Sequence, residues 1–283
     1  MEQPWTVQPQ MVQQTPAGQG RRNADSADRR PFDRCRWPDH RPDPSHQGCA
    51  IRCMTMHENS TAAKPTPADR AAAAAADGPP ALRVPFDATV LTESPISTER
   101  LVLRPLEASD APDVFEYQRI PEVLRYLPWP ERDRAQGYAH TATRAAGRVL
   151  AADGDFFVLA VTLLGTPSTG NGASDRVIGD MMVRVSSLAH AQLELGWVVH
   201  PDFQGRGYAR EAGLAVRDFV FETLDPHRVQ AFLDARNGSS AALCERLGMR
   251  REATILEEQY NDGEWQDTAV YGVLRREWAA ARG

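Results

Sequence analysis

The chain has 283 residues, with 32 basic and 38 acidic side chains and a net charge of −6. This length suits one sizeable domain with an extension, or two small domains. No run approaches the roughly 18 apolar residues of a membrane span, and no apolar stretch follows the charges at the N-terminus. We therefore expect a cytoplasmic protein with no membrane partner.

Only one basic residue, Lys64, is a lysine, and all the others are arginines. A Walker-type phosphate loop and a Schiff base each require a lysine. Neither chemistry is available to the part of the chain that follows Lys64.

Residues 1–83 are rich in Gln, Pro, Arg, Asp and Ala and show little apolar periodicity. Such a segment buries too little apolar surface to offset its ordering entropy, so we expect a disordered or low-complexity tail over 1–83. Its net charge of +2, against −8 for residues 84–283, is a weak basis for nucleic-acid binding. Met54 and Met56 lie within it, and one hypothesis is that translation starts at one of them, which would leave residues 1–53 out of the native protein.

The cysteines are too few and too unevenly spaced for a disulfide framework. They are Cys35, Cys49, Cys53 and Cys244, and the first three have His40, His46 and His57 nearby. A metal site is one interpretation of that group, but the spacing fits no common zinc pattern. We expect free thiols and no metal.

From residue 84 onward the pattern changes to alternating strands and helices. In chain order it predicts a strand at 98–106, helices at 109–119 and 132–150, strands at 156–164, 177–186 and 192–199, a helix at 211–223, a strand at 228–233, a helix at 239–247, and strands at 252–260 and 267–274. Three consecutive strands indicate a mixed α/β or α+β domain with an antiparallel meander, and argue against a doubly wound sheet.

The stretch from Glu194 to Arg210, ELGWVVHPDFQGRGYAR, leads from an apolar strand through a loop into a helix. Gly205 and Gly207 leave the backbone bare where a helix exposes its unpaired N–H groups. Such a terminus attracts phosphate, so the sequence predicts an anion site here.

The segment QGRGYA, Gln204 to Ala209, resembles the Q/R-x-x-G-x-G/A signature of the GNAT superfamily of N-acetyltransferases. The segments TERLVLRP, GWVVHPDFQGRGYAREA, NGSSAALCERLGMRREA and GEWQDTAVYGVL resemble its RimJ/RimL-type branch in order and spacing. The resemblance covers residues 82–283. It implies an acetyltransferase domain over 84–283, acetyl-CoA as co-substrate, and an α+β fold with a mostly antiparallel sheet of about six or seven strands flanked by about four helices.

The resemblance also implies which residues hold acetyl-CoA. The backbone of Val198 and Val199 would pair with the pantetheine arm, and the glycine loop would hold the pyrophosphate. The full expected set is Val198, Val199, Gln204, Gly205, Arg206, Gly207, Tyr208, Ala209, Arg210 and Asn237. The alternatives are that the two valines are core residues and that Arg206 and Arg210 are merely solvated.

Two residues are candidates for catalysis. Glu194 lies where many GNAT enzymes carry a glutamate that deprotonates the amine directly or through water, although a charge in this apolar strand could also form a structural salt bridge. Ser240 is the preferred acid for the leaving thiolate, because Cys244 stands where the family often has tyrosine. Its alternative role is a hydroxyl that caps the helix.

Other signals for catalytic residues are weaker. Gln259 stands where RimL-like proteins have a glutamate, so that base is not carried over. His200 and His227 at turns are more often bystanders than bases.

For the acceptor, the branch suggests a protein N-terminal α-amine of the ribosomal-protein type, and the acidic domain suits a basic partner. A small-molecule amine, such as an antibiotic or a polyamine, is the alternative. A CoA-binding module without turnover is the third hypothesis. The protein would be a monomer or a homodimer, and the loops at 127–134 and 165–175 would decide acceptor choice.

Overall fold

The computed structural model describes residues 81–170, 175–261 and 263–282. The predicted tail, with Cys35, Cys49 and Cys53, lies outside the described residues. The domain boundary at 83/84 and the interpretation of those cysteines therefore stay predictions.

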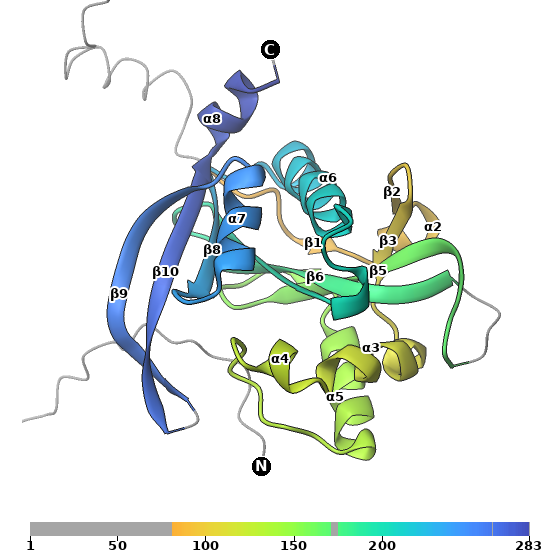
Figure 1. Ribbon diagram of the computed structural model, residues 1–283. Helices are drawn as coiled ribbons and strands as arrows, with labels where there is room; N and C mark the ends of the chain where they lie inside the picture. The colour runs from red at the N-terminus through yellow and green to blue at the C-terminus, as the bar shows by residue number, and fades with distance from the viewer. Residues whose placement is uncertain (1–80, 171–174, 262, 283) are drawn as a thin grey trace, which may run out of the picture. The chain divides into compact units, whose positions relative to one another are not determined.

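The described chain forms a mixture of helices and strands, with four strands in succession from β4 to β7 (Figure 1). The α-helices are α2 Val90–Glu93, α3 Ala111–Gln118, α4 Pro121–Leu124, α5 Arg134–Ala146, α6 Tyr208–Thr223, α7 Gly238–Arg246 and α8 Arg275–Ala280. The strands are β1 Phe86–Asp87, β2 Ile96–Ser97, β3 Leu101–Pro105, β4 Val149–Leu150, β5 Phe156–Pro167, β6 Asp175–Ser187, β7 Gln192–Val199, β8 Arg228–Asp234, β9 Arg250–Asn261 and β10 Glu264–Leu274.

Eight of these strands form one sheet in the order β2-β3-β5-β6-β7-β8-β10-β9, and β1 pairs with β4 separately. Every neighbouring pair in the large sheet is antiparallel except β7 with β8. The predicted α+β class with a mostly antiparallel sheet is confirmed. The sheet has one strand more than expected because the two-residue β2 extends its edge.

The parallel pair is also where the sheet opens. β7 pairs with β8 only from Gln192 to Glu194, opposite Arg228 to Gln230. β7 then continues to Val199 along β6, while β8 continues to Asp234 along β10. The two strands therefore part beyond Glu194, and the backbone edge of β7 is left without a strand partner on that side.

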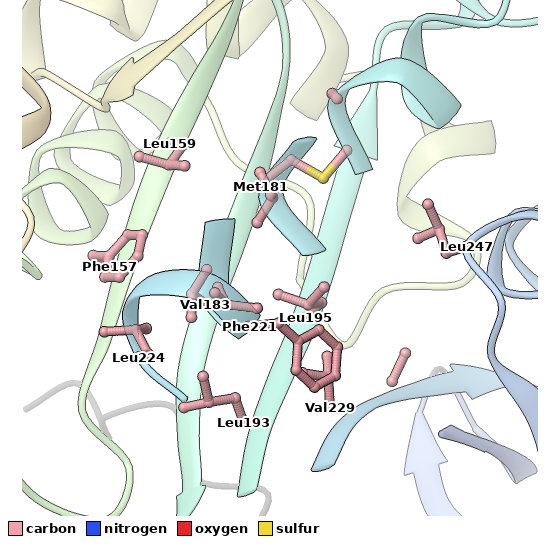
Figure 2. Close-up of a cluster of buried hydrophobic side chains, with 14 of the residues drawn as sticks. Phe157, Leu159, Met181, Val183, Leu193, Leu195, Phe221, Leu224, Val229 and Leu247 are labelled. Carbon is pink, nitrogen blue, oxygen red and sulfur yellow. The ribbon is translucent and has the colours of Figure 1, made fainter. Parts of the chain in front are cut away.

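Helices cover both faces of the sheet. Figure 1 shows α6 and α7 on one side and α3, α4 and α5 on the other. On the α6 side, Phe221 and Leu224 pack onto alternate residues of β5, β6 and β7, among them Leu193 and Leu195 (Figure 2). On the opposite side, Val114 and Tyr117 of α3 belong to a smaller core with residues of β5, β6 and β7.

A buried polar cluster fixes α3 and α5 to the sheet. Asp180 of β6, 1% exposed, accepts a hydrogen bond from the Tyr117 hydroxyl at 2.6 Å and pairs with Arg144 at 2.6 Å. Burial, with the Asp180 carboxylate next in importance, holds the pKa of Tyr117 well above its usual value, so the phenol stays a proton donor.

The predicted element boundaries shift at several places. The second helix was expected to reach residue 150 but ends at Ala146, because Gly147 adopts an extended backbone and Val149 begins β4. The first of the predicted strands corresponds to β3, which starts at Leu101 and not at residue 98. Helix α4 was not predicted, since its four residues are too few to show a periodicity.

Among the helices of the described residues, none is both long and apolar enough to cross a membrane.

Candidate functional site

A pocket of about 740 Å³ lies where β7 and β8 part. Its wall comes from the end of β7, the loop into α6, the start of α7 and the segment around α4. Of the predicted site residues it contains Val198, Val199, Gln204, Gly205, Gly207, Tyr208, Ala209, Arg210, Asn237 and Ser240. The structure thus brings together ten predicted residues from three separate segments.

The glycine loop has a left-handed backbone at both of its glycines. Gly205 has a φ of +72° and Gly207 a φ of +84°, and Gly207 is the N-cap of α6. Only glycine adopts this backbone without strain. A Cβ at Gly205 would meet no atom within 4 Å, so the loop faces open space beside the first-turn N–H groups of α6. This arrangement suits an anion.

Arg100 contacts the glycine loop and the first turn of α6. Its guanidinium donates to the carbonyl oxygen of Arg206 at 3.1 Å, lies 4.4 Å from the ring centroid of Tyr208 and pairs with Glu211 at 2.6 Å. Glu211 also accepts a hydrogen bond from the Thr98 hydroxyl at 2.6 Å. The sequence motifs TERLVLRP and GWVVHPDFQGRGYAREA contain these residues. Their pairing joins positions more than a hundred residues apart and could not be derived from either motif.

The loop is also tied to the end of β7. The Gln204 side chain donates to the carbonyl oxygen of Val199 at 2.8 Å. The His200 N–H donates to Ile178 of β6, so by alternation the backbone groups of Trp197 and Val199 point away from β6 toward the pocket. Pairing of a pantetheine arm with Val198 and Val199 stays a prediction, and this geometry favours Val199 and Trp197 for it.

Glu194 lies at the last residue pair before the strands part, opposite Gln230 of β8. Its carboxylate is 3.4 Å from the guanidinium of Arg184 on β6, and each of the two side chains is less than one-fifth exposed. Burial raises the pKa of Glu194, and the charge of Arg184 opposes that rise. Glu194 is not among the pocket-lining residues; by strand geometry it lies about 10 Å along β7 from Trp197. The ion pair with Arg184 is present, and the catalytic role of Glu194 stays a prediction.

Ser240 and Asn237 occupy the start of α7. The Asn237 side chain accepts from the Ser240 N–H at 3.0 Å, so Asn237 and not the Ser240 hydroxyl caps the helix. The Ser240 hydroxyl oxygen accepts from the Trp197 indole at 3.2 Å, which leaves the hydroxyl hydrogen for another acceptor.

Cys244 does not face the pocket. It is fully buried in the core beside α6, and burial raises the pKa of its thiol to about 12. His200 is also buried, and its imidazole accepts a hydrogen bond from the Asp202 N–H at 3.1 Å. His227 is exposed and absent from the pocket wall.

Several pocket residues were missed by sequence reasoning. Arg246 reaches the pocket from α7, Glu122 and Val123 reach it from α4, and Tyr126 from just after α4. Arg246 lies within a quoted motif, whereas α4 carried no motif at all. Arg206 was predicted in the site but does not line the pocket, and its guanidinium lies 5.9 Å from the ring centroid of Phe203.

Within the described ranges no group of three or more His, Cys, Asp and Glu side chains is arranged to hold a metal ion. The pocket does fit a phosphate-bearing molecule with a long uncharged arm. It offers the glycine loop with Arg210 and Arg246 at one end and the apolar wall of Val198 and Leu243 beside them.

Comparison with known proteins gives one family and several relatives. The acetyltransferase (GNAT) domain family matches residues 100–250. YnaD of Bacillus subtilis, named as an uncharacterized N-acetyltransferase, is 30% identical over 183 residues, which are 65% of this chain and 98% of YnaD. A GNAT-family acetyltransferase of Bacillus anthracis has a crystal structure that is 25% identical, with a TM-score of 0.54 over 64% of this chain and 98% of that one.

Two shorter matches carry acceptor names. YdaF of Bacillus subtilis, named as a candidate ribosomal N-acetyltransferase, is 31% identical over 85 residues, 30% of this chain and 46% of YdaF. The spermidine N(1)-acetyltransferase of Vibrio cholerae is 24% identical over 106 residues, 38% of this chain and 61% of that protein.

Proposed function

The chain belongs to the GNAT family of acetyl-CoA-dependent N-acetyltransferases, and we propose that its acceptor is the α-amine at the N-terminus of a protein. The observation that carries this proposal is the position of the Glu194 and Arg184 pair at the point where β7 and β8 part. It provides a carboxylate close to the pocket, with a pKa that burial raises and Arg184 keeps from rising further. Such a base suits an amine that is already partly neutral.

The glycine loop and the first turn of α6 would hold the pyrophosphate of acetyl-CoA, with Arg210 and Arg246 beside it. The open edge of β7 would pair with the pantetheine arm as a further strand would. This places the thioester near Trp197 and Ser240, between Glu194 and the start of α7. Acetyl-CoA supplies, as a thioester, the acetyl group that is transferred.

Glu194 takes the proton that the amine must lose. Water between the amine and the carboxylate carries that proton. The amine nitrogen then forms a bond to the acetyl carbonyl carbon, and the carbon–sulfur bond breaks. The Ser240 hydroxyl donates a hydrogen bond to the departing thiolate sulfur, and solvent supplies the one proton that converts the thiolate into the CoA thiol. Cys244 takes no part, because its thiol is buried and its pKa is raised to about 12.

The chemistry of the acceptor follows from the strength of this base. An α-amine has a pKa near roughly 7.8, so a useful minority is neutral near pH 7, while a lysine-like amine with a pKa of about 10.4 is neutral in only on the order of one molecule in a thousand. Burial raises the pKa of Glu194 above its ordinary value, and the charge of Arg184 limits that rise, so Glu194 stays a modest base. A modest base is sufficient for an α-amine.

The carboxylates next to the pocket also argue against a polyamine. Glu194 pairs with Arg184, and Asp234 at the end of β8 pairs with Arg236 at 2.7 Å. Glu264 shares the same Arg236 at 2.6 Å. A polyamine is recognised by several carboxylates that are free to meet its charges; these three are already paired, and the pocket wall itself offers one carboxylate, Glu122.

The test is an acceptor panel with labelled acetyl-CoA and the full chain. We expect transfer to peptides with a free N-terminus and no transfer to the same peptides after N-terminal formylation, even when they contain lysine. Spermidine and an aminoglycoside complete the panel. Glu194→Gln should slow transfer to the peptides.

Two outcomes would contradict the proposal. Label on spermidine or the aminoglycoside with none on any peptide would assign a small-molecule acceptor. Thermal stabilisation by CoA with no turnover of any amine would instead indicate a binding module without catalysis.

A further inference from the structure

One face of the sheet carries uncovered apolar side chains at β8, β10 and β9. Phe232 of β8 lies opposite Val270 of β10, and the next position on the same face pairs Thr268 of β10 with Ile255 of β9. Phe232 and Ile255 are each 40% exposed, and Val270 is half-buried. We call Phe232, Val270 and Ile255 the apolar strip.

The apolar strip belongs to neither hydrophobic core of the described residues. The alternate residues of β10, such as Ala269 and Tyr271, point to the opposite face and are buried beneath α6 and α7. The smaller core, under α3 and α5, contains residues of β5, β6 and β7 but none of β9 or β10. The strip therefore lies on the α3 and α5 side of the sheet, beyond the strands that those helices cover.

Polar groups that already have partners border the strip. Toward the β9–β10 turn, the Asn261 amide donates to Gln266 at 3.0 Å. Toward the other end, Arg228 lies over Gly272 and pairs with Glu252. These polar side chains already have hydrogen-bond or ion-pair partners. The apolar surface between them is therefore the part of this face whose burial by a ligand would release the most free energy.

The strip is continuous with the reaction site. Phe232 follows Gln230 on the same face of β8, and Gln230 lies opposite Glu194. One strand spacing across and two residues along the strand separate Phe232 from Glu194, a distance of about 8 Å. An extended chain covers that distance in two to three residues.

We propose that the apolar strip binds an apolar side chain at the second or third position of the acceptor protein. This inference rests on the proposed function, since it needs a peptide whose N-terminal amine lies near Glu194. The arginine pairing of Glu194 and Asp234 supports an apolar rather than a cationic acceptor segment. A small amine would not reach the strip.

The test compares hexapeptides that share a free N-terminal serine and differ only at positions two and three. We expect leucine or phenylalanine there to give a KM on the order of tenfold lower than serine or lysine, with a similar kcat. Phe232→Thr should remove most of this preference, and Ile255→Thr, two strands farther from Glu194, should remove less of it. Both variants should leave the dissociation constant of acetyl-CoA unchanged.

Leu256→Thr is the matched control. Leu256 is 72% exposed and adjoins Ile255 on β9, but it lies in the irregular stretch between the pairs Ile255–Thr268 and Gln259–Gln266 and is not part of the strip. It should leave the preference between peptides intact. Circular dichroism and melting temperature of all three variants confirm that the comparison is made on folded protein.

Each other outcome overturns the inference. Equal KM values for apolar and serine peptides would remove the strip from acceptor binding while the α-amine proposal stands. Transfer to spermidine alone would refute the α-amine proposal itself. A dimer of the full chain that Phe232→Thr dissociates, with the peptide preference unchanged, would assign the strip to a second copy.

Discussion

The guanidinium of Arg100, just before β3, lies 2.6 Å from the carboxylate of Glu211 in the first turn of α6. The same guanidinium donates to the carbonyl oxygen of Arg206 in the glycine loop. The ion pair therefore sets where the loop sits relative to the helix start that the proposal assigns to pyrophosphate.

Replacing Arg100 with alanine should weaken acetyl-CoA binding several-fold with little change in melting temperature. Arg100 is substantially exposed, so its contribution to stability is small, while the loop loses a contact that orders it before the ligand arrives. Isothermal titration calorimetry with acetyl-CoA measures the effect. Arg83→Ala is the matched control, because Arg83 forms an exposed pair with Asp225, which follows the C-terminal end of α6. Equal losses in the two variants would refute a role specific to the loop.

The same relationship shows what the sequence could and could not predict. The glycine loop, the end of β7 and the start of α7 were found because each is a local motif whose chemistry depends on neighbouring residues. The pairing of Arg100 with Glu211 joins two motifs 111 residues apart, and only the folded sheet brings them together. The contribution of α4 was missed because four residues show no periodicity.

Cys244 shows a different limit of sequence reasoning. Its place in the motif marks it as a departure from the family pattern that the sequence resembles. The motif could not show that the helix turns this residue into the core, since the direction of a helical side chain depends on what the helix packs against.

A second prediction concerns Gly207. Its φ of +84° is costly for any residue with a Cβ, and a Cβ here would lie 3.4 Å from the Arg100 guanidinium. Gly207→Ala should lower the free energy of unfolding by about 1 kcal/mol. It should also weaken acetyl-CoA binding by more than the small increase in unfolded protein can account for. Gly263→Ala is the control, since Gly263 has a φ of +85° near the β9–β10 turn and open space around its Cβ position. It should show a similar loss in melting temperature with unchanged binding. Unchanged binding in Gly207→Ala would contradict the loop's assigned role.

A third prediction uses the pH dependence of the rate. The proposed base works only when ionised, so kcat/KM should fall as pH drops through the folded-state pKa of Glu194, which burial raises above its ordinary value. Arg184→Met removes the charge that favours the ionised form and should move this acidic limb to higher pH, while Arg184→Lys should move it less. The measurement is kcat/KM for one peptide from pH 5 to 9, which gives the position of the acidic limb in each variant. An unmoved limb in Arg184→Met would rule out Glu194 as the titrating group.

Stability separates the two roles of Glu194. Because its folded pKa is raised, the neutral carboxyl is favoured by folding; that contribution is complete below the unfolded pKa and is lost as pH rises through the folded pKa. At pH 7.5 the charged side chain thus costs stability, so Glu194→Gln should be folded, at least as stable as the natural protein, and slow. A strongly destabilised variant with normal turnover would instead make the Arg184 pair structural.

A fourth prediction concerns Cys244. Because burial raises its pKa to about 12, the native thiol carries almost no thiolate at pH 8 and should resist iodoacetamide. Peptide mapping should find Cys244 modified only after denaturation, and Cys244→Ala should retain turnover with modestly lower stability. Modification of the native protein at Cys244 that acetyl-CoA prevents would place this thiol in the pocket after all.

The last prediction concerns the buried cluster that anchors α3 and α5 beside the reaction site. Asp180 is 1% exposed and bonded to both Arg144 and Tyr117, so Asp180→Ala leaves the Arg144 charge buried without its partner. We expect a loss on the order of 3–5 kcal/mol in the free energy of unfolding, measured by urea titration. Glu116→Ala breaks an exposed pair with Arg119 on the same side of the sheet and should cost less than about 1 kcal/mol. If both variants lost the same small amount, the cluster would not anchor these helices, and the position of α4 at the pocket wall would need another explanation.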